Sequence, residues 1–520
     1  MQRFAFLFYD STAPRPIHHT RILPQGFHAR QQCRYIACSA ENRAQPSERK
    51  VLHVVSYINI LIWKFSSDLS KYIPISEFSS DFLKYIPISK YFIDSLNSLC
   101  YNGNTSCREV IALIERKEYL KQLMCWKDEQ VIKVVTGIRR CGKSTLLAQY
   151  QDWLKANGVP DTQIVSVNFE ELEYEELLDY KKLYAYLKER LVSGKTTYIF
   201  LDEIQKVSGF EKVVDSLYVK PDVDIYITGS NAYLLTCDLA TLLTGRYVEI
   251  RLLPLSLKEF LAVTGLEPER GFAEYLRCGG LPYVARMERT TEKVETYLEG
   301  IYNTVIVRDI EDRQIHKESD LVRRKITDIA LLKTIAKYLA SVVGSPVSIR
   351  SITDYLISSG RKVSPNTVDD YMDALTESFI FYPAERFDIV GKQLLKLNKK
   401  YYIVDLGLRN HIVPRRNYDL GFSLENVVYF ELLRRGYKVM IGKLGSTEVD
   451  FVAEKQGEYV YYQVTADMTA QETFEREMRP LTMIGDNYEK IILTADHLTV
   501  GNYNGIRVKN LTDWLLGKDA

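Results

Sequence analysis

Residues 131–146 read VIKVVTGIRRCGKSTL, and this stretch decides the fold. Residues 131–135 form a short apolar run, which is typical of a strand buried in a parallel sheet. Residues 137–144 then match the pattern G-x-x-x-x-G-K-[ST] at every fixed position, and Leu146, Leu147 and Tyr150 follow at helical spacing. A strand, a glycine loop and a helix in this order are the context that the motif requires. A chance match in a glycine-containing loop is the weaker alternative.

The residue types of this loop suit the binding of a triphosphate. Gly137 and Gly142 let the backbone curl so that successive N–H groups point at phosphate oxygens, and the following helix presents its positive N-terminal end. Lys143 can reach the β- and γ-phosphates, and the Ser144 hydroxyl can ligate Mg²⁺. The sequence therefore predicts ATP and Mg²⁺ as cofactors, with a nucleotide-binding loop made of Gly137, Ile138, Arg139, Arg140, Cys141, Gly142, Lys143, Ser144 and Thr145.

A second stretch, TYIFLDE at residues 197–203, is an apolar run that ends in two acids. It predicts a second core strand whose end faces the phosphates. In that position Asp202 would hold Mg²⁺ together with Ser144, and Glu203 would orient and deprotonate the attacking water. Taken alone, such a run is an ordinary strand with an acidic end, but its place after a complete phosphate loop favours the catalytic interpretation.

Two further features lie downstream of these acids. An apolar run leads into TGSN at residues 228–231. Ser230 and Asn231 are candidates to contact the γ-phosphate, and a strand-to-helix turn capped by Ser or Asn explains the same residues equally well. Arg246 then precedes a strand expected at 247–252. It is a candidate arginine finger, reaching the ATP of a neighbouring subunit, although an arginine before a strand is more often a surface charge.

The composition bounds the class of protein. The chain has 520 residues, too many for one core, and 68 basic against 67 acidic side chains give a net charge of +1. The whole chain therefore carries no polyelectrolyte signature, and any nucleic-acid contact must come from a local patch. Eight cysteines without paired metal-ligand spacing favour a reduced, cytoplasmic setting. No apolar run reaches the ~18 residues that a membrane span requires.

The first 107 residues have a different texture from the rest. Prolines interrupt the region, and SSDL at 66–69 with KYIPIS at 71–76 is echoed by SSDF at 79–82 with KYIPIS at 84–89. Two copies are too few to bury a core as a solenoid. We therefore expect an atypical extension at 1–107, either disordered or added by a wrong start site. A genuine N-terminal interaction segment is the alternative.

Several motifs together resemble the AAA-type ATPase of a prokaryotic two-part family, in which the ATPase precedes a C-terminal domain of unknown function. They are the phosphate loop, LDE at 201–203, TGSN at 228–231, Gly245-Arg246, LLPLSLKEF at 252–260, GGLPY at 279–283 and Tyr302 with Arg308-Asp309-Ile310. The resemblance covers about residues 112–518. It implies an α/β fold, with a P-loop AAA-type parallel sheet domain at 108–262 and a helical lid at 263–325.

The same resemblance implies roles for single residues. Ser230 or Asn231 would be the sensor of the γ-phosphate, and Asn168 would relay its signal to Glu203. Residues 280–282 would begin a lid helix near the nucleotide base.

Residues 326–400 predict a winged-helix module. An apolar helical face recurs at 332–339, and Ser364-Pro365 begins a third helix. Such a helix often reads DNA, but this one carries four acids, which repel phosphate. Basic residues elsewhere are better DNA candidates, namely Arg361, Lys362, Lys392, Lys396, Lys399 and Lys400. A connector, or a contact between copies of the chain, is the alternative role.

Residues 401–520 resemble the mixed α/β core of restriction endonucleases. Glu425 falls in a helix expected at 424–435, and Asp450 falls in a strand at 447–452. Active members carry acid-x-Lys on the next strand, where this chain has Gln463 and Thr465. One metal ligand and the lysine charge are therefore missing, which predicts a retained fold without nuclease activity. Ordinary solvated acids at strand ends are the alternative.

These features predict an ATP-driven switch that hydrolyses ATP to ADP and phosphate with Glu203 as the base. The partners considered are DNA, another protein and further copies of the chain. An ATP-regulated, Mg²⁺-dependent nuclease or DNA-binding protein is the second hypothesis. A binding module that uses ATP only as a structural clamp is the third.

Overall fold

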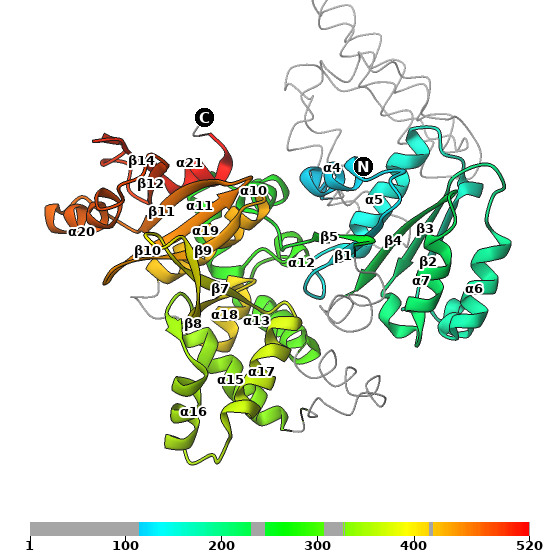
Figure 1. The fold of residues 1–520 in the computed structure, drawn as a ribbon, viewed down its shortest axis with the longest axis horizontal. Helices are drawn as coiled ribbons and strands as arrows, with labels where there is room; N and C mark the ends of the chain where they lie inside the picture. The colour runs from blue at the N-terminus through cyan, green and yellow to red at the C-terminus, as the bar shows by residue number, and fades with distance from the viewer. Residues whose placement is uncertain (1–113, 230–244, 306–325, 327, 415–419, 519–520) are drawn as a thin grey trace, which may run out of the picture. The chain divides into compact units, whose positions relative to one another are not determined.

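The computed structural model describes residues 114–229, 245–305, 326, 328–414 and 420–518. The chain separates into two compact units, Met1–Val110 and Ile111–Ala520. Everything below concerns the second unit (Figure 1). The extension expected at 1–107 therefore lies outside the described residues.

The first sheet contains five parallel strands in the order β2-β3-β4-β1-β5. They are β1 (Ile132–Thr136), β2 (Ile164–Asn168), β3 (Thr197–Asp202), β4 (Val223–Gly229) and β5 (Tyr247–Arg251). Strand β4 lies between β1 and β3, so the ends of the two predicted motif strands flank the end of β4. Because all strands run the same way, their carboxyl ends meet at one edge of the sheet, where ligands bind in such folds.

Helices cover both faces of this sheet, which explains why its central strands read as nearly continuous apolar runs. Successive residues of β1 point to opposite faces: Val135 joins the core that contains α5, and Val134 joins the core that contains α6 and α7. The helices are α4 (Lys117–Cys125), α5 (Lys143–Ala156), α6 (Tyr180–Glu189) and α7 (Phe210–Tyr218), and they can be followed in Figure 1. Short 3₁₀ turns lie at Asp161–Gln163, Leu172–Leu178 and Ile204–Lys206.

A helical stretch follows β5. It contains α10 (Leu257–Thr264), α11 (Pro268–Cys278), α12 (Pro282–Arg286) and α13 (Thr291–Asn303). The first helix begins with a capping box, in which Ser256 and Glu259 each accept a backbone N–H of the other. Among the described residues no helix is both long and apolar enough to cross a membrane.

Three helices and a hairpin come next, with a short strand between the first two helices. The helices are α15 (Ile329–Ser341), α16 (Ile349–Ser358) and α17 (Pro365–Glu377), and the strands are β6 (Pro346–Val347), β7 (Phe381–Asp388) and β8 (Gln393–Ile403). The predicted apolar face of α15 is buried, with Leu332, Ile335 and Leu339 fully covered. Ser348 and Ser364 are the N-cap residues of α16 and α17, and their side chains accept backbone N–H groups.

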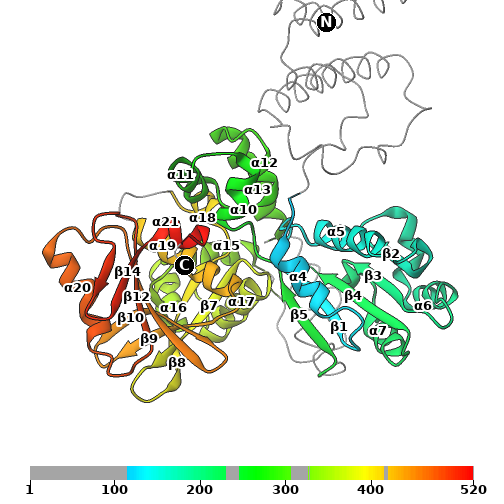
Figure 2. The same cartoon turned by 90° about the horizontal axis from the view of Figure 1, so that it is seen from above.

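The second sheet is mixed and has nine strands in the order β13-β14-β12-β11-β10-β9-β7-β8-β6. Its other elements are α18 (Leu406–Ile412), α19 (Leu420–Arg434), β9 (Lys438–Leu444), β10 (Thr447–Lys455), β11 (Glu458–Thr465), α20 (Gln471–Thr482), β12 (Glu489–Thr494), β13 (Gly501–Tyr503), β14 (Ile506–Asn510) and α21 (Leu511–Leu516). The core on one face includes α19 and α21, and the core on the other includes α20 (Figure 2).

This sheet joins two parts that the sequence analysis separated. Strand β7 pairs in parallel with β9, and β8 runs from residue 393 to residue 403. The boundary expected between residues 400 and 401 therefore falls inside a strand. The hairpin of the proposed winged helix and the strands of the proposed nuclease-like part form one hydrogen-bonded sheet.

Candidate nucleotide-binding site

The phosphate loop connects β1 to α5 and depends on two glycines. Gly137 has a φ of 144° and Gly142 a φ of 104°, values that favour glycine. A Cβ atom on Gly137 would lie 2.2 Å from the carbonyl oxygen of Leu252, so no larger residue fits there. Gly142 is the N-cap residue of α5, and its carbonyl accepts the N–H of Leu146 at 2.9 Å. The loop thus leads directly into a helix N-terminus, the arrangement that binds phosphate.

Lys143 folds back over this loop. Its side chain is 4% exposed, and Nζ donates to the carbonyl oxygens of Gly137 at 3.1 Å and Ile138 at 3.5 Å. The same nitrogen lies 3.6 Å from Glu203 Oε1. The ammonium group therefore sits between the loop and the acids that end β3.

Asp202 and Ser144 lie near each other. Burial raises the pKa of the Asp202 carboxyl above its usual range, and the nearby Ser144 hydroxyl partly offsets this rise. A hydroxyl and a carboxylate are oxygen ligands of the kind that Mg²⁺ prefers. The two residues that the sequence analysis paired as metal ligands thus fit such an ion, which would also favour the ionised form of Asp202.

Glu203 has an unusual backbone conformation. Its φ of 54° and ψ of 46° lie in the left-handed region, which a residue with a side chain adopts at a free-energy cost of about 1–3 kcal/mol. The surroundings hold it there. Its N–H donates to Thr228 Oγ1 at 2.9 Å, and its carboxylate accepts from Gln205 Nε2 at 2.5 Å.

Thr228, near the end of β4, connects the two acids. Its hydroxyl donates to the Asp202 carboxylate and accepts the N–H of Glu203. Ser230 and Asn231, the predicted γ-phosphate contacts of the same TGSN turn, lie outside the described residues. The signal that points to Thr228 is its place near the end of a strand that is buried from Asp224 to Gly229 and lies between the two motif strands.

The remaining loop residues have different surroundings. Ile138 and Cys141 are buried, whereas Thr145 is exposed. The Arg139 guanidinium pairs with Glu170 at 2.8 Å. Arg140 lies close enough to Tyr297 to lower the pKa of that phenol, which burial raises more strongly.

Asn168 ends β2 beside Asp202 of β3, and its side chain makes local hydrogen bonds. Its amide nitrogen donates to Glu171 at 3.1 Å, and its amide oxygen accepts the N–H of Glu170 at 3.0 Å. These bonds fix the turn after β2. The relay from Asn168 to Glu203, implied by the family resemblance, has no direct contact here.

Arg246 lies at the opposite edge of the sheet from the phosphate loop. Its carbonyl oxygen accepts the N–H of Ile132, the first residue of β1, at 2.8 Å. Its guanidinium pairs with Asp215 at 2.5 Å and lies 5.3 Å from the centre of the Tyr218 ring. Arg246 therefore does not join Lys143 and Glu203 in its own chain.

Comparison with known proteins identifies the family. The family model described as an AAA domain matches residues 129–261, and a domain of unknown function (DUF8612) matches residues 269–419. An uncharacterized protein of Haemophilus influenzae is 40% identical over 411 residues, which cover 78% of this chain and 99% of that protein. This chain belongs to the same family of AAA-domain proteins.

Two further matches extend the comparison of this AAA-domain protein. An uncharacterized protein of Methanocaldococcus jannaschii is 27% identical over 352 residues, which cover 62% of this chain and 71% of that protein. A Walker-type ATPase of Pyrococcus abyssi is 17% identical in a structural match with a TM-score of 0.38, covering 57% of this chain and 95% of that one.

A second cluster of titratable groups lies in the C-terminal part of the AAA-domain protein. Lys400 on β8 is 3% exposed, and its Nζ lies 2.7 Å from Glu448 Oε1 and 3.5 Å from Glu425 Oε2. The carboxylates of Glu425, Asp450 and Glu448 together raise the pKa of Lys400. Burial raises the pKa of Asp450 well above its usual range, and Asp450 Oδ2 accepts the N–H of Val464 at 2.8 Å.

Gln463 and Thr465, which stand where the expected nuclease-like pattern has an acid and a lysine, make hydrogen bonds of their own. Gln463 Oε1 accepts the N–H of Asp450 at 3.3 Å, and its Nε2 donates to Glu477 at 3.1 Å. Thr465 Oγ1 donates to the carbonyl oxygen of Asp467 at 3.1 Å. Glu425 and Asp450 thus come together as expected, but around an ammonium group from β8.

Lys400 is excluded from the predicted DNA contacts, and three of the other basic residues are paired with acids. A side chain that is 3% exposed cannot reach a phosphate backbone, so Lys400 is removed from that set. The Lys396 side chain lies outside the described residues, and Lys362 is exposed. The others each lie beside an acid, in the pairs Arg361–Asp328 at 3.1 Å, Lys392–Asp486 at 3.0 Å and Lys399–Glu385 at 3.6 Å.

Proposed function

We propose that this AAA-domain protein binds ATP with Mg²⁺ at residues 137–145 and hydrolyses it slowly, so that the bound nucleotide switches its C-terminal part. One observation carries the proposal. Thr228 hydrogen-bonds to both Asp202 and Glu203, Ser144 lies beside Asp202, and Lys143 links Glu203 to the loop. The loop, the proposed metal ligands and the proposed base therefore lie together at one edge of the sheet.

Each group has a role that follows from its position. Loop N–H groups would bind the β- and γ-phosphate oxygens, and Lys143 would exchange its carbonyl and carboxylate contacts for those oxygens. Ser144 and Asp202 would hold Mg²⁺, which neutralises charge on the phosphates. The Glu203 carboxylate would orient a water molecule and take its proton as oxygen attacks the γ-phosphorus and the bond to ADP breaks.

The test compares binding and turnover in three variants of the full chain. Lys143→Ala should lose ATP binding, and Glu203→Gln should keep binding but lose hydrolysis. Lys155→Ala is the matched control, since Lys155 lies on the same helix α5, with its side chain 47% exposed. Unchanged ATP affinity in Lys143→Ala, or unchanged turnover in Glu203→Gln, would contradict the assigned roles.

We also propose that the C-terminal part has a nuclease-like fold without nuclease activity, which fits a partner-binding or signal-receiving role. The support is that Gln463 and Thr465 on β11 offer neither a carboxylate nor an ammonium group, while Lys400 from β8 already pairs with Glu425 and Glu448. Incubation with supercoiled plasmid and Mg²⁺ or Mn²⁺ should leave the plasmid intact. Nicking that disappears in Asp450→Ala would favour the ATP-regulated nuclease instead.

A further inference from the structure

One extended stretch connects the phosphate loop to the rest of the molecule. We call residues 252–256, between β5 and α10, the linking segment. Its first residue, Leu252, donates its N–H to the carbonyl of Thr136 at 2.8 Å. The Leu252 carbonyl packs so closely on Gly137 that only glycine fits. A shift of the linking segment would therefore move the first residue of the phosphate loop.

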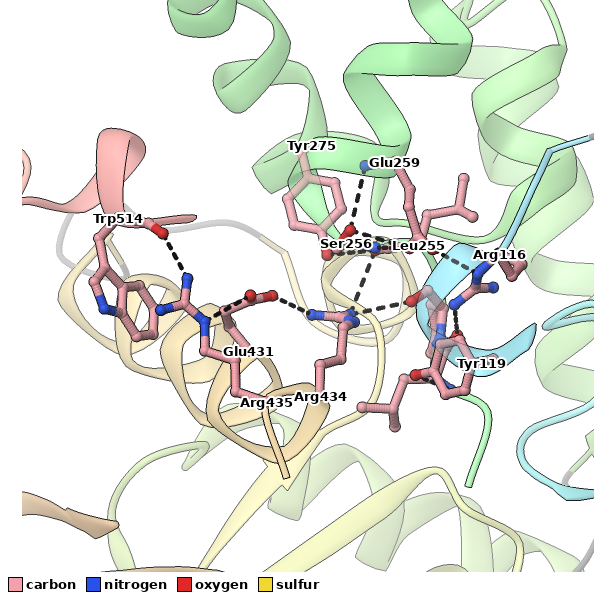
Figure 3. A network of polar contacts seen from close by, with 12 residues as sticks. Arg116, Tyr119, Leu255, Ser256, Glu259, Tyr275, Glu431, Arg434, Arg435 and Trp514 are labelled. Carbon is pink, nitrogen blue, oxygen red and sulfur yellow. Dashed lines mark hydrogen bonds and ion pairs between the residues drawn. The ribbon is translucent and has the colours of Figure 1, made fainter. Parts of the chain in front are cut away.

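A buried arginine from the N-terminal side ties this segment to the loop itself. Arg116 Nη2 donates to the Leu253 carbonyl at 2.8 Å, and Nη1 donates to the Cys141 carbonyl at 3.4 Å. Its Nε pairs with Glu259 at 2.8 Å. One guanidinium thus holds the phosphate loop, the linking segment and α10 together, as Figure 3 shows for the segment and the helix.

A second buried arginine holds the same segment from the C-terminal part. Arg434 is the last residue of α19, and its Nη2 donates to the carbonyls of Pro254 at 3.1 Å and Leu255 at 3.4 Å (Figure 3). Tyr275 on α11 donates its hydroxyl to the same Leu255 carbonyl at 2.8 Å. The contact between Arg434 and Pro254 joins positions about 180 residues apart in the chain.

The contacts continue behind Arg434 to the last helix. Its Nη1 pairs with Glu431 at 3.1 Å, and Glu431 also accepts from Arg435 Nε at 3.0 Å. Arg435 donates to the Trp514 carbonyl on α21 at 2.5 Å, with its guanidinium carbon 3.9 Å from the centre of the indole. Figure 3 shows this series from Trp514 to Arg116. Two carboxylates, those of Glu259 and Glu431, offset part of the charge of the three guanidinium groups, and each guanidinium also donates to a backbone carbonyl.

We propose that Arg434 is a positioning residue of the nucleotide site, and that its grip on the linking segment couples bound nucleotide to α19 and α21. The inference rests on the proposed ATP binding. Charge-assisted hydrogen bonds to two successive carbonyls fix the segment in register. Coupling of this kind is reciprocal. If an ordered α19 raises the affinity of the loop for nucleotide, then bound nucleotide stabilises α19 by the same free energy.

The test uses the full chain, with Arg434→Met, Arg434→Lys and the control Arg507→Met. Arg507 lies on β14 in an exposed pair with Glu489, far from any predicted nucleotide contact in sequence. Affinity for ADP and for a non-hydrolysable ATP analogue is measured, together with amide hydrogen exchange of α19 and α21 with and without nucleotide. Melting temperature without nucleotide reports any purely structural effect.

Arg434→Met should weaken nucleotide binding about tenfold, a typical coupling magnitude, and abolish the slowing of α19 exchange by nucleotide. Arg434→Lys should restore part of both, and it serves as the test variant if Arg434→Met does not fold. Nucleotide affinity and nucleotide-dependent exchange equal to wild type in the folded variant would overturn the inference. A wild type that binds no nucleotide would instead overturn the proposed ATP site, and the positioning role with it.

Discussion

At the scale of the residue, Thr228 connects the two acids of the proposed site. Its hydroxyl donates to the Asp202 carboxylate and accepts the backbone N–H of Glu203. Thr228→Val keeps the shape of the side chain and removes both hydrogen bonds. It leaves the buried N–H of Glu203 without its acceptor, a loss of about 1–3 kcal/mol. We expect ATP turnover to fall about tenfold or more, with a smaller change in ATP affinity, in a steady-state assay paired with a binding titration.

Thr353→Val is the matched control for that substitution. Thr353 is also buried, 4% exposed, and its hydroxyl donates to the Ile349 carbonyl on α16. It should lose stability without any selective loss of turnover. Equal effects of the two substitutions on turnover would remove Thr228 from the site.

Asp405 is a residue whose charge state should show in the pH dependence of stability. It accepts N–H groups from Gly280 at 2.6 Å and Leu408 at 3.1 Å, and burial raises its pKa from 3.8 to about 6. A carboxyl with a raised folded-state pKa adds stability below about pH 4 and loses it as pH rises through about 6.

Asp405→Asn removes this titration. The free energy of unfolding of wild type, minus that of the variant, should fall by roughly 3 kcal/mol between pH 4 and pH 7, which follows from the rise of the pKa from 3.8 to about 6. Urea unfolding at several pH values measures this difference. A difference that stays constant across the range would contradict the raised pKa.

At the scale of the element, the sequence was informative where a pattern is local. The phosphate loop, the β3 strand with its acids and the apolar face of α15 all appear as expected, because each follows from a short run of residues. Strand β8 begins at Gln393 and includes the polar residues Asn398, Lys399 and Lys400, of which the two lysines pair with the two-residue edge strand β6.

Contacts between distant elements could not be predicted in this way. Thr228 gains its role only because β4 lies between β1 and β3 in the sheet order. From the sequence alone Lys400 resembles a surface lysine, because its partners Glu425 on α19 and Glu448 on β10 come later in the chain. Arg116 and Arg434 carry no local signal, since their partners lie far away in the chain.

Lys400 tests how β8 is fixed to its neighbours. Lys400→Met leaves the partly exposed Glu425 and Glu448 without their counter-ion, which should destabilise the fold by about 1–3 kcal/mol, below the ~3–5 kcal/mol for breaking a fully buried pair. Adding Glu448→Gln and Glu425→Gln should recover much of this loss. Denaturant unfolding gives the values, with Lys399→Met on the same strand as a control for an outward lysine. A Lys400→Met variant as stable as that control would refute the counter-ion role.

At the scale of the whole molecule, the position of Arg246 predicts a site shared between copies. It lies at the edge of the sheet opposite its own phosphate loop, so any contact with ATP must be to a neighbour. Separately inactive Arg246→Ala and Glu203→Gln chains should therefore regain turnover when mixed. Lys143→Ala mixed with Glu203→Gln is the control, because both changes affect the same chain's contribution and no complete site can form. Equal, absent turnover in both mixtures would assign Arg246 to its pair with Asp215 alone.

We propose that bound nucleotide changes the C-terminal part through the backbone contacts of the linking segment with α19. This coupling requires that the metal and the phosphates bind at the phosphate loop. The most direct measurement is a crystal structure of the full chain with a non-hydrolysable ATP analogue and Mn²⁺, located by its anomalous signal. We predict the metal peak between the Ser144 hydroxyl and the Asp202 carboxylate, with the phosphates inside residues 137–145. A metal peak elsewhere, or an analogue bound away from this loop, would contradict the account.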